Sequence, residues 1–445
     1  MRFIPVTCED QTDMLARIGV GSVDDLFADV PEDARLARPL ALPDPMTELE
    51  LSAHLKALAA ANTPAGESVS FLGGGCYDHY VPAIVDAVVS KPAFFTAYTP
   101  YQPEVSQGTL QAIYEYQSMI CQLTGMEVAN ASMYDGATAF AEAALMACRV
   151  TRRPRVVVSA TVHPEWRATL ATYVEAGTVV VTEVSAAAGL ADIEALRLQL
   201  ADDVAAVMVS SPTFYGTLDD LAALAALAHD AGALLVVGTN PILLGVMEPP
   251  ASFGADIVVA EGQPLGSAMS YGGPGLGIFA CRQEHLRQMP GRVAGRTTDV
   301  DGKTGFVLTF STREQHIRRE RATSNICSNH ALNALAAGVY LSAVGREGLA
   351  GIATACVAKA HYLEAALVES GRFERAFSAP FGYEFALRYR GDVASMQAAM
   401  LDRGFFAGLD LARFAAEDAG LVLFAVTEKR TRVDIDRFVT EVSTL

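Results

Sequence analysis

Apolar residues show two different spacings along this 445-residue chain. From about residue 69 onward, short runs of β-branched and aliphatic residues alternate with longer stretches in which apolar residues recur every three or four positions. The short runs predict buried strands, and the longer pattern predicts amphipathic helices. Strands that alternate with helices are typical of crossover connections and a mainly parallel sheet. The predicted fold class is therefore α/β.

Several of the predicted strands are apolar throughout, as expected for a sheet that is covered on both faces. They lie at 155–160, 179–184, 205–211, 233–238, 256–260 and 276–280. Helices are predicted between them at 136–149, 164–175, 190–200 and 218–231. The C-terminal part adds a long helix at 329–344 and strands at 382–389 and 421–426.

This pattern divides the chain into three parts. Residues 1–68 are acidic and interrupted by prolines, with short helices predicted at 12–18 and 47–61, and they form an arm that packs on something else. Residues 69–325 form the large α/β domain with the mainly parallel sheet. Residues 326–445 form a smaller C-terminal α/β domain.

Composition narrows the class of protein. A formal charge of −18 argues against nucleic acid and against an anionic membrane, because both select for basic patches. The seven cysteines are far apart and form no Cys-x-x-Cys pair, so we predict neither a disulfide framework nor a metal site. No apolar run is long enough to span a bilayer. A metabolic protein of the reducing cytoplasm fits these features best.

One position indicates a cofactor fold that lacks its reactive group. The predicted strand 256–260 and the glycine-rich segment 270–277 flank a stretch that carries the Schiff-base lysine in folds that bind pyridoxal phosphate. Here Gln263 occupies that stretch, and a neutral amide cannot form an imine with an aldehyde. We therefore predict that this chain cannot hold the cofactor covalently by itself.

Gly136, Ala137 and Thr138 open a predicted helix with small residues, which lets backbone N–H groups approach an anion at the positive end of the helix dipole. Pyridoxal-phosphate folds bind the phosphate in this way. The alternative is an ordinary N-cap at Asp135 with a glycine beside it, and from the motif alone that interpretation is the stronger one.

Two further positions correspond to groups that contact the cofactor ring. His163 follows a predicted strand where an aromatic ring often stacks on the pyridine, although a surface histidine that begins a helix is equally consistent. Asn240 lies where an aspartate normally pairs with the pyridinium nitrogen. An amide can donate to the ring but cannot balance its charge, so the ring would be a poor electron sink.

A polar and aromatic segment, residues 98–108, offers side chains to a ligand. Its two prolines favour an extended backbone, which presents Tyr98, Tyr101, Gln102 and Gln107 instead of burying them. A packing loop with satisfied phenols is the alternative. The charged run 312–321 predicts a helix or a subunit contact, although such a run is usually a solvated face, and His316 has no evident catalytic partner in it.

Four segments together resemble the P-protein of the glycine cleavage system, and most closely the N-terminal-half subunit of its split form, subunit 1 of glycine dehydrogenase (decarboxylating). They are 98–108, 261–266 with 270–279, 290–297 and 312–327. The likeness covers residues 1 to about 344 densely and the remainder in length and pattern. Asn240 and Thr213 depart from the pattern expected for this subunit, which weakens any expectation of residual cofactor binding.

The resemblance implies a pyridoxal-phosphate-dependent transferase fold of the aspartate aminotransferase type (fold type I). It implies assembly, as a heterodimer or heterotetramer, with a homologous subunit 2 that carries the lysine-bound cofactor. The pair would decarboxylate glycine and transfer the aminomethyl group to the lipoyl group of H-protein, and this chain would be inactive alone. Tyr98, Tyr101, Gln102 and Gln107 would then place substrate in the shared cleft.

Two other interpretations remain open. The chain could be a non-catalytic binding protein that kept the fold and lost the assembly. It could also be an autonomous pyridoxal-phosphate enzyme that uses another lysine, and Lys303 lies closest after the glycines among the five lysines of the chain, Lys56, Lys91, Lys303, Lys359 and Lys429.

Overall fold

The structure, a computed structural model, describes residues 5–36, 38–177 and 179–445. The chain separates into two units, Met1–Thr63 and Pro64–Leu445. Among the described residues, no helix combines the length and the apolar character needed to cross a membrane.

The described residues of the N-terminal unit form short helices, with no buried side chain among them. They are α1 (Cys8–Ile18), η1 (Asp24–Phe27), η2 (Glu32–Ala34) and α2 (Glu48–Ala59). Thr7 and Thr47 begin α1 and α2 with capping boxes, in which the hydroxyl accepts from the third helical amide and an acidic side chain accepts from the cap amide. None of the described residues of these four helices is buried. The predicted helices 12–18 and 47–61 are present, and their apolar side chains face solvent.

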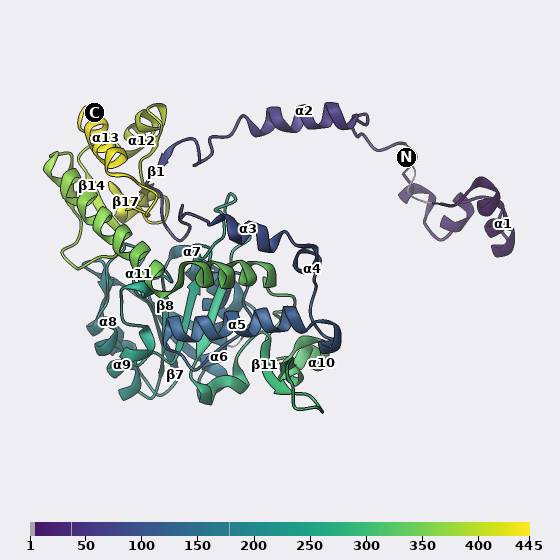
Figure 1. Ribbon diagram of the computed structural model, residues 1–445, viewed down its shortest axis with the longest axis horizontal. Helices are drawn as coiled ribbons and strands as arrows, with labels where there is room; N and C mark the ends of the chain where they lie inside the picture. Colours follow the sequence, from purple (N-terminus) through teal and green to yellow (C-terminus); the bar gives the residue numbers. More distant parts are fainter. Residues whose placement is uncertain (1–4, 37, 178) are drawn as a thin grey trace. The chain divides into compact units, whose positions relative to one another are not determined.

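A seven-stranded sheet forms the centre of the second unit, with strand order β2-β10-β9-β8-β7-β3-β4 (Figure 1). The strands are β2 (Val128–Ala129), β3 (Arg155–Ser159), β4 (Val180–Val184), β7 (Val204–Ser210), β8 (Leu234–Thr239), β9 (Ile257–Glu261) and β10 (Gly277–Cys281). The five strands from β4 to β9 pair in parallel, and β10 runs antiparallel to β9 and β2. The mainly parallel sheet is confirmed, and each of the six predicted strands in this region matches an observed one within one or two residues.

Helices cover both faces of this sheet, which explains why its strands are apolar throughout. Val156 and Val158 of β3 pack in one core cluster with α6 (Gly136–Thr151) and α7 (Pro164–Val174). Val157, between them in sequence, points to the other core cluster. That second cluster includes residues of α3 (Ala83–Val89), α5 (Gln107–Thr124), α8 (Ile193–Gln199), α9 (Leu221–Asp230) and α11 (Ala331–Glu369). Successive side chains of a strand thus point to opposite faces of the sheet and pack against different helix layers.

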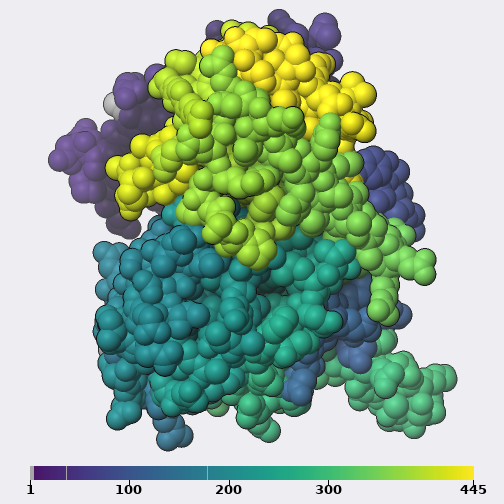
Figure 2. Space-filling view, turned by 90° about the vertical axis from the view of Figure 1, so that its left-hand side faces the viewer, coloured from purple at the N-terminus to yellow at the C-terminus, as the bar shows by residue number. Residues whose placement is uncertain are grey.

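The C-terminal elements build a second, antiparallel sheet with strand order β13-β14-β17-β16. Its strands are β13 (Phe373–Arg375), β14 (Glu384–Tyr389), β16 (Leu409–Asp410) and β17 (Leu421–Ala425), with helices α12 (Val393–Asp402) and α13 (Arg432–Ser443). The long helix α11 leads from the large sheet to this one, and Gly345 interrupts its helical geometry with a φ of 62°. Figure 2 shows the yellow-green surface of the C-terminal elements meeting the teal surface of the large sheet's elements.

Short elements complete the unit. They are β1 (Val69–Ser70), α4 (Pro92–Phe95), η3 (Pro103–Val105), β5 (Ala186–Ala187), β6 (Leu190–Ala191), η4 (Leu243–Gly245), η5 (Pro250–Phe253), η6 (Gln283–Gln288), β11 (Val293–Thr298), β12 (Thr304–Thr309), η7 (Ser311–Arg313), α10 (Gln315–Arg318), η8 (Arg319–Arg321), β15 (Phe405–Phe406), η9 (Leu411–Arg413) and η10 (Ala416–Asp418). β1 pairs in parallel with β15, so residues 69–70 join the C-terminal elements.

Two sequence predictions were too simple. The segment 190–200 is a short strand, β6, followed by the seven-residue helix α8, because Asp192 caps α8 through the amide of Ala195 and so delays the helix. The run 312–321 folds as η7, α10 and η8, three single turns in place of one continuous helix.

Candidate functional site

A pocket lies where the carboxyl ends of the parallel strands approach β14 of the smaller sheet. The lining residues follow or end β7, β8 and β9 and come also from residues 74–77, from α7 and from β14. They are Gly74, Gly75, Tyr77, His163, Trp166, Ser210, Pro212, Thr213, Phe214, Thr239, Asn240, Pro241, Glu261 and Glu384. The cavity that they enclose is small, about 60 Å³. Ligands bind at this edge of open α/β sheets, so the pocket is the candidate functional site.

The N-terminus of α6, predicted as an anion site at Gly136, Ala137 and Thr138, is occupied by side chains of this chain. Asp135 accepts from the Thr138 amide at 2.7 Å and forms a capping box. The Glu261 carboxylate accepts from the amide of Gly136 at 2.9 Å. Its other oxygen accepts from the amides of Gln263 and Leu276, both at 2.8 Å. An internal carboxylate therefore holds the place where a phosphate would use these N–H groups.

The same place is also closed sterically. A side-chain carbon added at Gly136 would lie 2.3 Å from a ring carbon of Trp166 and 2.9 Å from the backbone nitrogen of Glu261. Trp166 in turn packs on Phe140 of α6, with ring centroids 5.8 Å apart. A phosphate at this amide would have to compete with the Glu261 carboxyl group. The described residues at this helix end do not fit the phosphate of pyridoxal phosphate.

Gln263 is buried, with 5% of its surface exposed, and its amide is fully engaged. The side-chain oxygen accepts from the Tyr77 amide at 3.0 Å, and the nitrogen donates to the carbonyls of Tyr77 at 3.1 Å and Ser267 at 2.8 Å. The side chain thereby connects the loop after β9 to residue 77. None of the described residues that line the pocket is a lysine. Lys303 lies in the turn between β11 and β12 with 77% of its side chain exposed.

Replacing Gln263 by lysine is expected to destabilise the chain without creating a cofactor site. The substitution leaves the buried Tyr77 amide without an acceptor and buries an ammonium group, a combined loss of several kcal/mol. The thermal unfolding midpoint should fall, and added pyridoxal phosphate should produce no imine absorption and no borohydride-stable label at residue 263. Gln263→Met, which loses the same hydrogen bonds without adding a charge, is the control that separates the two effects. A labelled lysine would contradict this prediction.

The two predicted ring contacts are also bound within the chain. Asn240 donates to the Tyr383 hydroxyl at 2.6 Å and accepts from the amide of Ile242 at 3.0 Å. Nε2 of His163 lies 2.8 Å from the Gly74 carbonyl, and Nδ1 accepts from the Glu165 amide at 3.1 Å. These partners require a neutral imidazole with its proton on Nε2, and burial lowers the pKa of His163 accordingly. His163 thus lines the pocket and also caps α7.

Glu384 of β14 is a second buried carboxyl in the pocket. It accepts from the Gly74 amide at 2.6 Å and from the Tyr77 hydroxyl at 2.9 Å. Burial raises the pKa of Glu384 to about 7, against the lowering effect of these two hydrogen bonds. Burial likewise raises the pKa of Glu261 to about 7, while its three backbone donors act in the opposite direction. The pocket is acidic and contains no positively charged side chain among its lining residues.

These raised pKa values predict that stability falls as pH rises. An unfolded glutamate ionises near pH 4.3, and folded Glu384 keeps its proton until about pH 7. Between these values the folded state binds more protons, so the free energy of unfolding decreases by a few kcal/mol at most. Glu384→Gln cannot ionise; its side-chain oxygen can accept from the Gly74 amide, and its NH2 group can donate to the Tyr77 hydroxyl in place of the bond that this hydroxyl now donates. We expect the urea midpoint of the variant, relative to that of the wild type, to be higher at pH 8 than at pH 5. An equal difference between the two midpoints at both pH values would show that Glu384 does not stay protonated in the folded state.

A second cluster gathers around Arg292, which is 4% exposed. Its Nε donates to Glu314 at 3.1 Å and its Nη2 donates to the Tyr101 hydroxyl at 2.8 Å. The His316 ring lies 4.9 Å from the Tyr101 ring, and its Nδ1 is 3.4 Å from the same Glu314 carboxylate. Cys327 Sγ lies 3.9 Å from Nη2 of Arg292. His316 therefore does have partners, and part of the charged run 312–321 is buried instead of solvated.

The other predicted cleft residues differ in how much of their chemistry remains available. Tyr98 is 75% exposed and shares a 2.7 Å hydrogen bond with Ser328. Gln102 is exposed at the start of η3. The Gln107 amide exchanges two hydrogen bonds with the backbone of Phe306, at 2.8 and 2.9 Å, which fixes α5 to β12. Tyr98, Tyr101 and Gln102 are thus the better placed to contact another molecule.

Sequence reasoning missed Glu261, Glu384, Arg292 and Glu314. A signal existed for the first two, since each is a lone acidic residue in or beside a predicted apolar strand. Their partners Gly136 and Gly74 are 125 and 310 positions away, so no local pattern pairs them.

The sequence model of the family described as glycine cleavage system P-protein matches residues 1–442. A probable glycine dehydrogenase (decarboxylating) subunit 1 of Geobacillus kaustophilus is 50% identical over 99% of this chain and 98% of its own length. The protein of the same name from Chlorobium chlorochromatii is 51% identical, with both chains fully covered.

Solved structures also include a member of the P-protein family. The crystal structure of glycine decarboxylase (P-protein) of the glycine cleavage system, in inhibitor-bound form, superposes with a TM-score of 0.91 at 44% identity over the whole of both chains. A Burkholderia pseudomallei sphingosine-1-phosphate lyase matches in fold alone, with a TM-score of 0.67 at 19% identity over 93% of this chain and 94% of its own. The fold is that of the pyridoxal-phosphate-dependent enzymes of fold type I.

Proposed function

Because this chain belongs to the P-protein family of the glycine cleavage system, we propose that it is the subunit of a two-subunit glycine decarboxylase that completes the active site without holding the cofactor. Its relatives are named subunit 1 of glycine dehydrogenase (decarboxylating), so the activity is that of an assembly. The proposed partner is a homologous subunit 2 that binds pyridoxal phosphate through a lysine. Together they would decarboxylate glycine and transfer the aminomethyl group to the lipoyl group of H-protein.

The observation that best supports cofactor binding by the partner alone is the Glu261 carboxylate at the N-terminus of α6. It uses the Gly136 amide that a phosphate would need, and Gln263 and Asn240 are likewise committed to hydrogen bonds within the chain. Each polar group of the former cofactor site therefore has an internal partner. These contacts support a subunit whose own pocket is structural.

The surface that would reach the shared cleft is the one around Tyr101. Its phenol is held by Arg292, and its ring packs beside His316, so the side chain is ordered before any ligand arrives. Pre-ordering lowers the entropic penalty of placing a substrate. The proposed role of Tyr98, Tyr101 and Gln102 is substrate placement, and proton transfer is left to the partner.

The proposed location is the reducing cytoplasm. The seven free cysteines support this prediction.

Reconstitution tests the proposal. The purified chain with added pyridoxal phosphate should show no exchange of labelled bicarbonate into glycine, and activity should appear on addition of the lysine-bearing subunit and lipoylated H-protein. Borohydride treatment of the active mixture should label a lysine of the partner only. Exchange by the chain alone would overturn the division of labour. Failure of the two chains to associate would favour the non-catalytic binding protein.

A further inference from the structure

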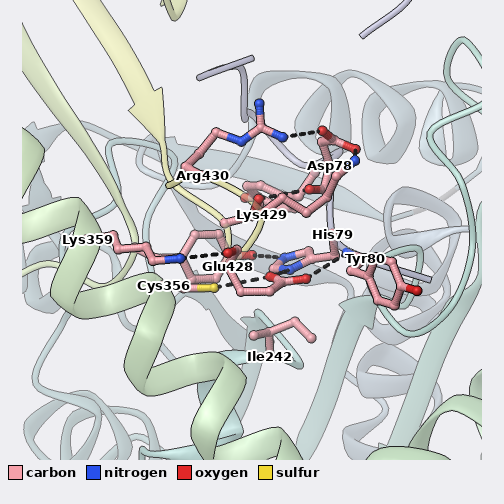
Figure 3. A network of polar contacts seen from close by, with 12 residues as sticks. Asp78, His79, Tyr80, Ile242, Cys356, Lys359, Glu428, Lys429 and Arg430 are labelled. Carbon is pink, nitrogen blue, oxygen red and sulfur yellow. Dashed lines mark hydrogen bonds and ion pairs between the residues drawn. The ribbon is translucent and has the colours of Figure 1, made fainter. Parts of the chain in front are cut away.

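Three potential metal ligands meet at a point that the proposed function does not use. His79 lies in the loop before α3, Cys356 on α11, and Glu428 in the loop after β17 (Figure 3). Nδ1 of His79 is 2.6 Å from Oε2 of Glu428, and Cys356 Sγ is 3.5 Å from the same oxygen. All three ligand atoms lie within 4.8 Å of one another. His79 and Cys356 are buried, and the Glu428 side chain is 16% exposed.

The chemistry and spacing of these atoms fit zinc. One nitrogen, one thiol sulfur and one carboxylate oxygen suit Zn²⁺, whereas Mg²⁺ and Ca²⁺ require oxygen ligands. Ordinary zinc bond lengths at tetrahedral angles place sulfur and oxygen about 3.6 Å apart and nitrogen and oxygen about 3.4 Å apart. The observed sulfur–oxygen distance of 3.5 Å already agrees. The nitrogen–oxygen pair, 2.6 Å apart around a shared proton, needs to open by about 0.8 Å.

Outer contacts orient two of the three ligands, Glu428 and His79. Oε1 of Glu428 accepts from the Tyr80 amide at 2.6 Å, and Lys359 Nζ donates to the Glu428 carbonyl at 2.6 Å. Nε2 of His79 lies 3.4 Å from the Tyr383 hydroxyl, which can accept its proton when Nδ1 binds a metal. Such a partner on the second ring nitrogen is the usual support of a metal-binding histidine.

The site has room for a fourth ligand, and the charges of the bound metal and its ligands would cancel. A cavity of about 450 Å³ adjoins Glu428 and is lined by Tyr80, Pro82, Tyr340, Val344, Ile352, Glu428 and Lys429. The Tyr340 hydroxyl is fully buried and finds no hydrogen-bond partner among the described residues. A water from the cavity can complete the tetrahedron. The thiolate and carboxylate balance a divalent cation, so binding leaves no net charge to bury.

The simpler alternative is a buried ion pair between His79 and Glu428 that needs no metal. Hydrogen bonding and charge from His79, with the Tyr80 amide, overcome the effect of burial and lower the pKa of Glu428 to about 2. An ion pair accounts for two of the groups. It leaves unexplained a thiol directed at the same oxygen and a fully buried phenol without a partner.

We propose that His79, Cys356 and Glu428 bind one Zn²⁺ ion, with a water from the adjoining cavity as the fourth ligand. Binding displaces two protons to solvent, the Cys356 thiol proton and the proton shared between Nδ1 of His79 and Oε2 of Glu428, and leaves the imidazole proton on Nε2. The metal joins α11, the loop before α3 and the loop after β17, and so fastens the smaller sheet to the large one. This site is separate from the Tyr101 surface and does not depend on the proposed activity. Its ligands, 79, 356 and 428, are too far apart in sequence for motif spacing to show it.

Metal titration of the full chain tests the site. After removal of metals with a chelator, the wild type should bind one Co²⁺ per chain, with the charge-transfer absorption of a thiolate–cobalt bond, and Zn²⁺ should displace it. Cys356→Ala should lose this absorption and at least about tenfold in affinity. Cys281→Ala, which removes an equally buried thiol from β10, is the matched control and should bind normally.

Two further variants keep the test decisive if Cys356→Ala does not fold. Glu428→Gln keeps the volume and removes the charge, and it should also abolish the absorption. Tyr383→Phe should weaken binding about 10- to 100-fold while leaving the absorption in place. Absence of the band in the wild type, or a band of equal strength in Cys356→Ala, would overturn the proposal, because the metal would then be bound adventitiously elsewhere.

Discussion

Replacing Arg292 by alanine is expected to destabilise the chain by about 3–5 kcal/mol and to remove most activity of the reconstituted enzyme. Arg292 and Glu314 have side chains only 4% and 6% exposed, so alanine leaves an uncompensated buried carboxylate. One oxygen of Glu314 already lacks a hydrogen-bond partner among the described residues, which increases the penalty. Urea unfolding of the purified chain measures the stability change.

The loss of activity has a separate cause, because the same guanidinium holds the Tyr101 hydroxyl. Tyr101→Phe removes this hydrogen bond and keeps the charge pair. It should leave stability within about 1 kcal/mol while raising KM for glycine in the reconstituted enzyme. An unchanged KM would show that Tyr101 does not contact the substrate.

The matched control is an arginine whose ion pair is exposed. Arg390 pairs with Glu374, and both side chains are at least half exposed, so Arg390→Ala should change stability by no more than about 1 kcal/mol. Combining Arg292→Ala with Glu314→Gln removes both charges and should recover part of the lost stability. If Arg292→Ala behaves like Arg390→Ala, the buried pair is not a significant source of stability.

Removing the apolar face of the N-terminal unit is expected to abolish assembly with the second subunit. Leu51, Leu55 and Leu58 follow helical spacing on α2 and are 45%, 53% and 56% exposed. An isolated 12-residue helix with no buried residue gains little stability of its own, so its apolar side chains need a partner surface. Each leucine is already about half buried, so burying the exposed half contributes about 0.7–1.5 kcal/mol, and replacing all three with glutamine should weaken association about 40- to 2000-fold.

Sedimentation of the chain with the lysine-bearing subunit measures this effect. Leu198→Gln on α8, at 83% exposed, is the control for an exposed leucine outside the N-terminal unit and should leave association unchanged. Deletion of residues 1–63 should reproduce the triple variant, with the remainder folded, because the chain divides at this boundary. Full association after the triple substitution would contradict an arm that binds the partner.

Much of the candidate site was predictable as a set of positions but not as a set of contacts. Gln263, Asn240, His163 and Gly136 were identified because each stands at a fixed place relative to a predicted strand or helix. Their bonding partners were not, since Tyr383, Gly74 and Glu261 come from distant parts of the chain. His316 was interpreted as isolated for the same reason.

The α/β class, the strand positions of the parallel sheet and the resemblance to P-protein could be read from the amino-acid sequence alone. These features depend on local periodicity and on short segments of contiguous residues, which a sequence contains directly. Three other features became visible only in the folded chain: Glu261 occupies the anion position at α6, Arg292 and Glu314 form a buried pair, and residues 79, 356 and 428 converge. These depend on crossover connections and on burial, because a side chain's partner and its charge state are set by whatever the fold packs against it.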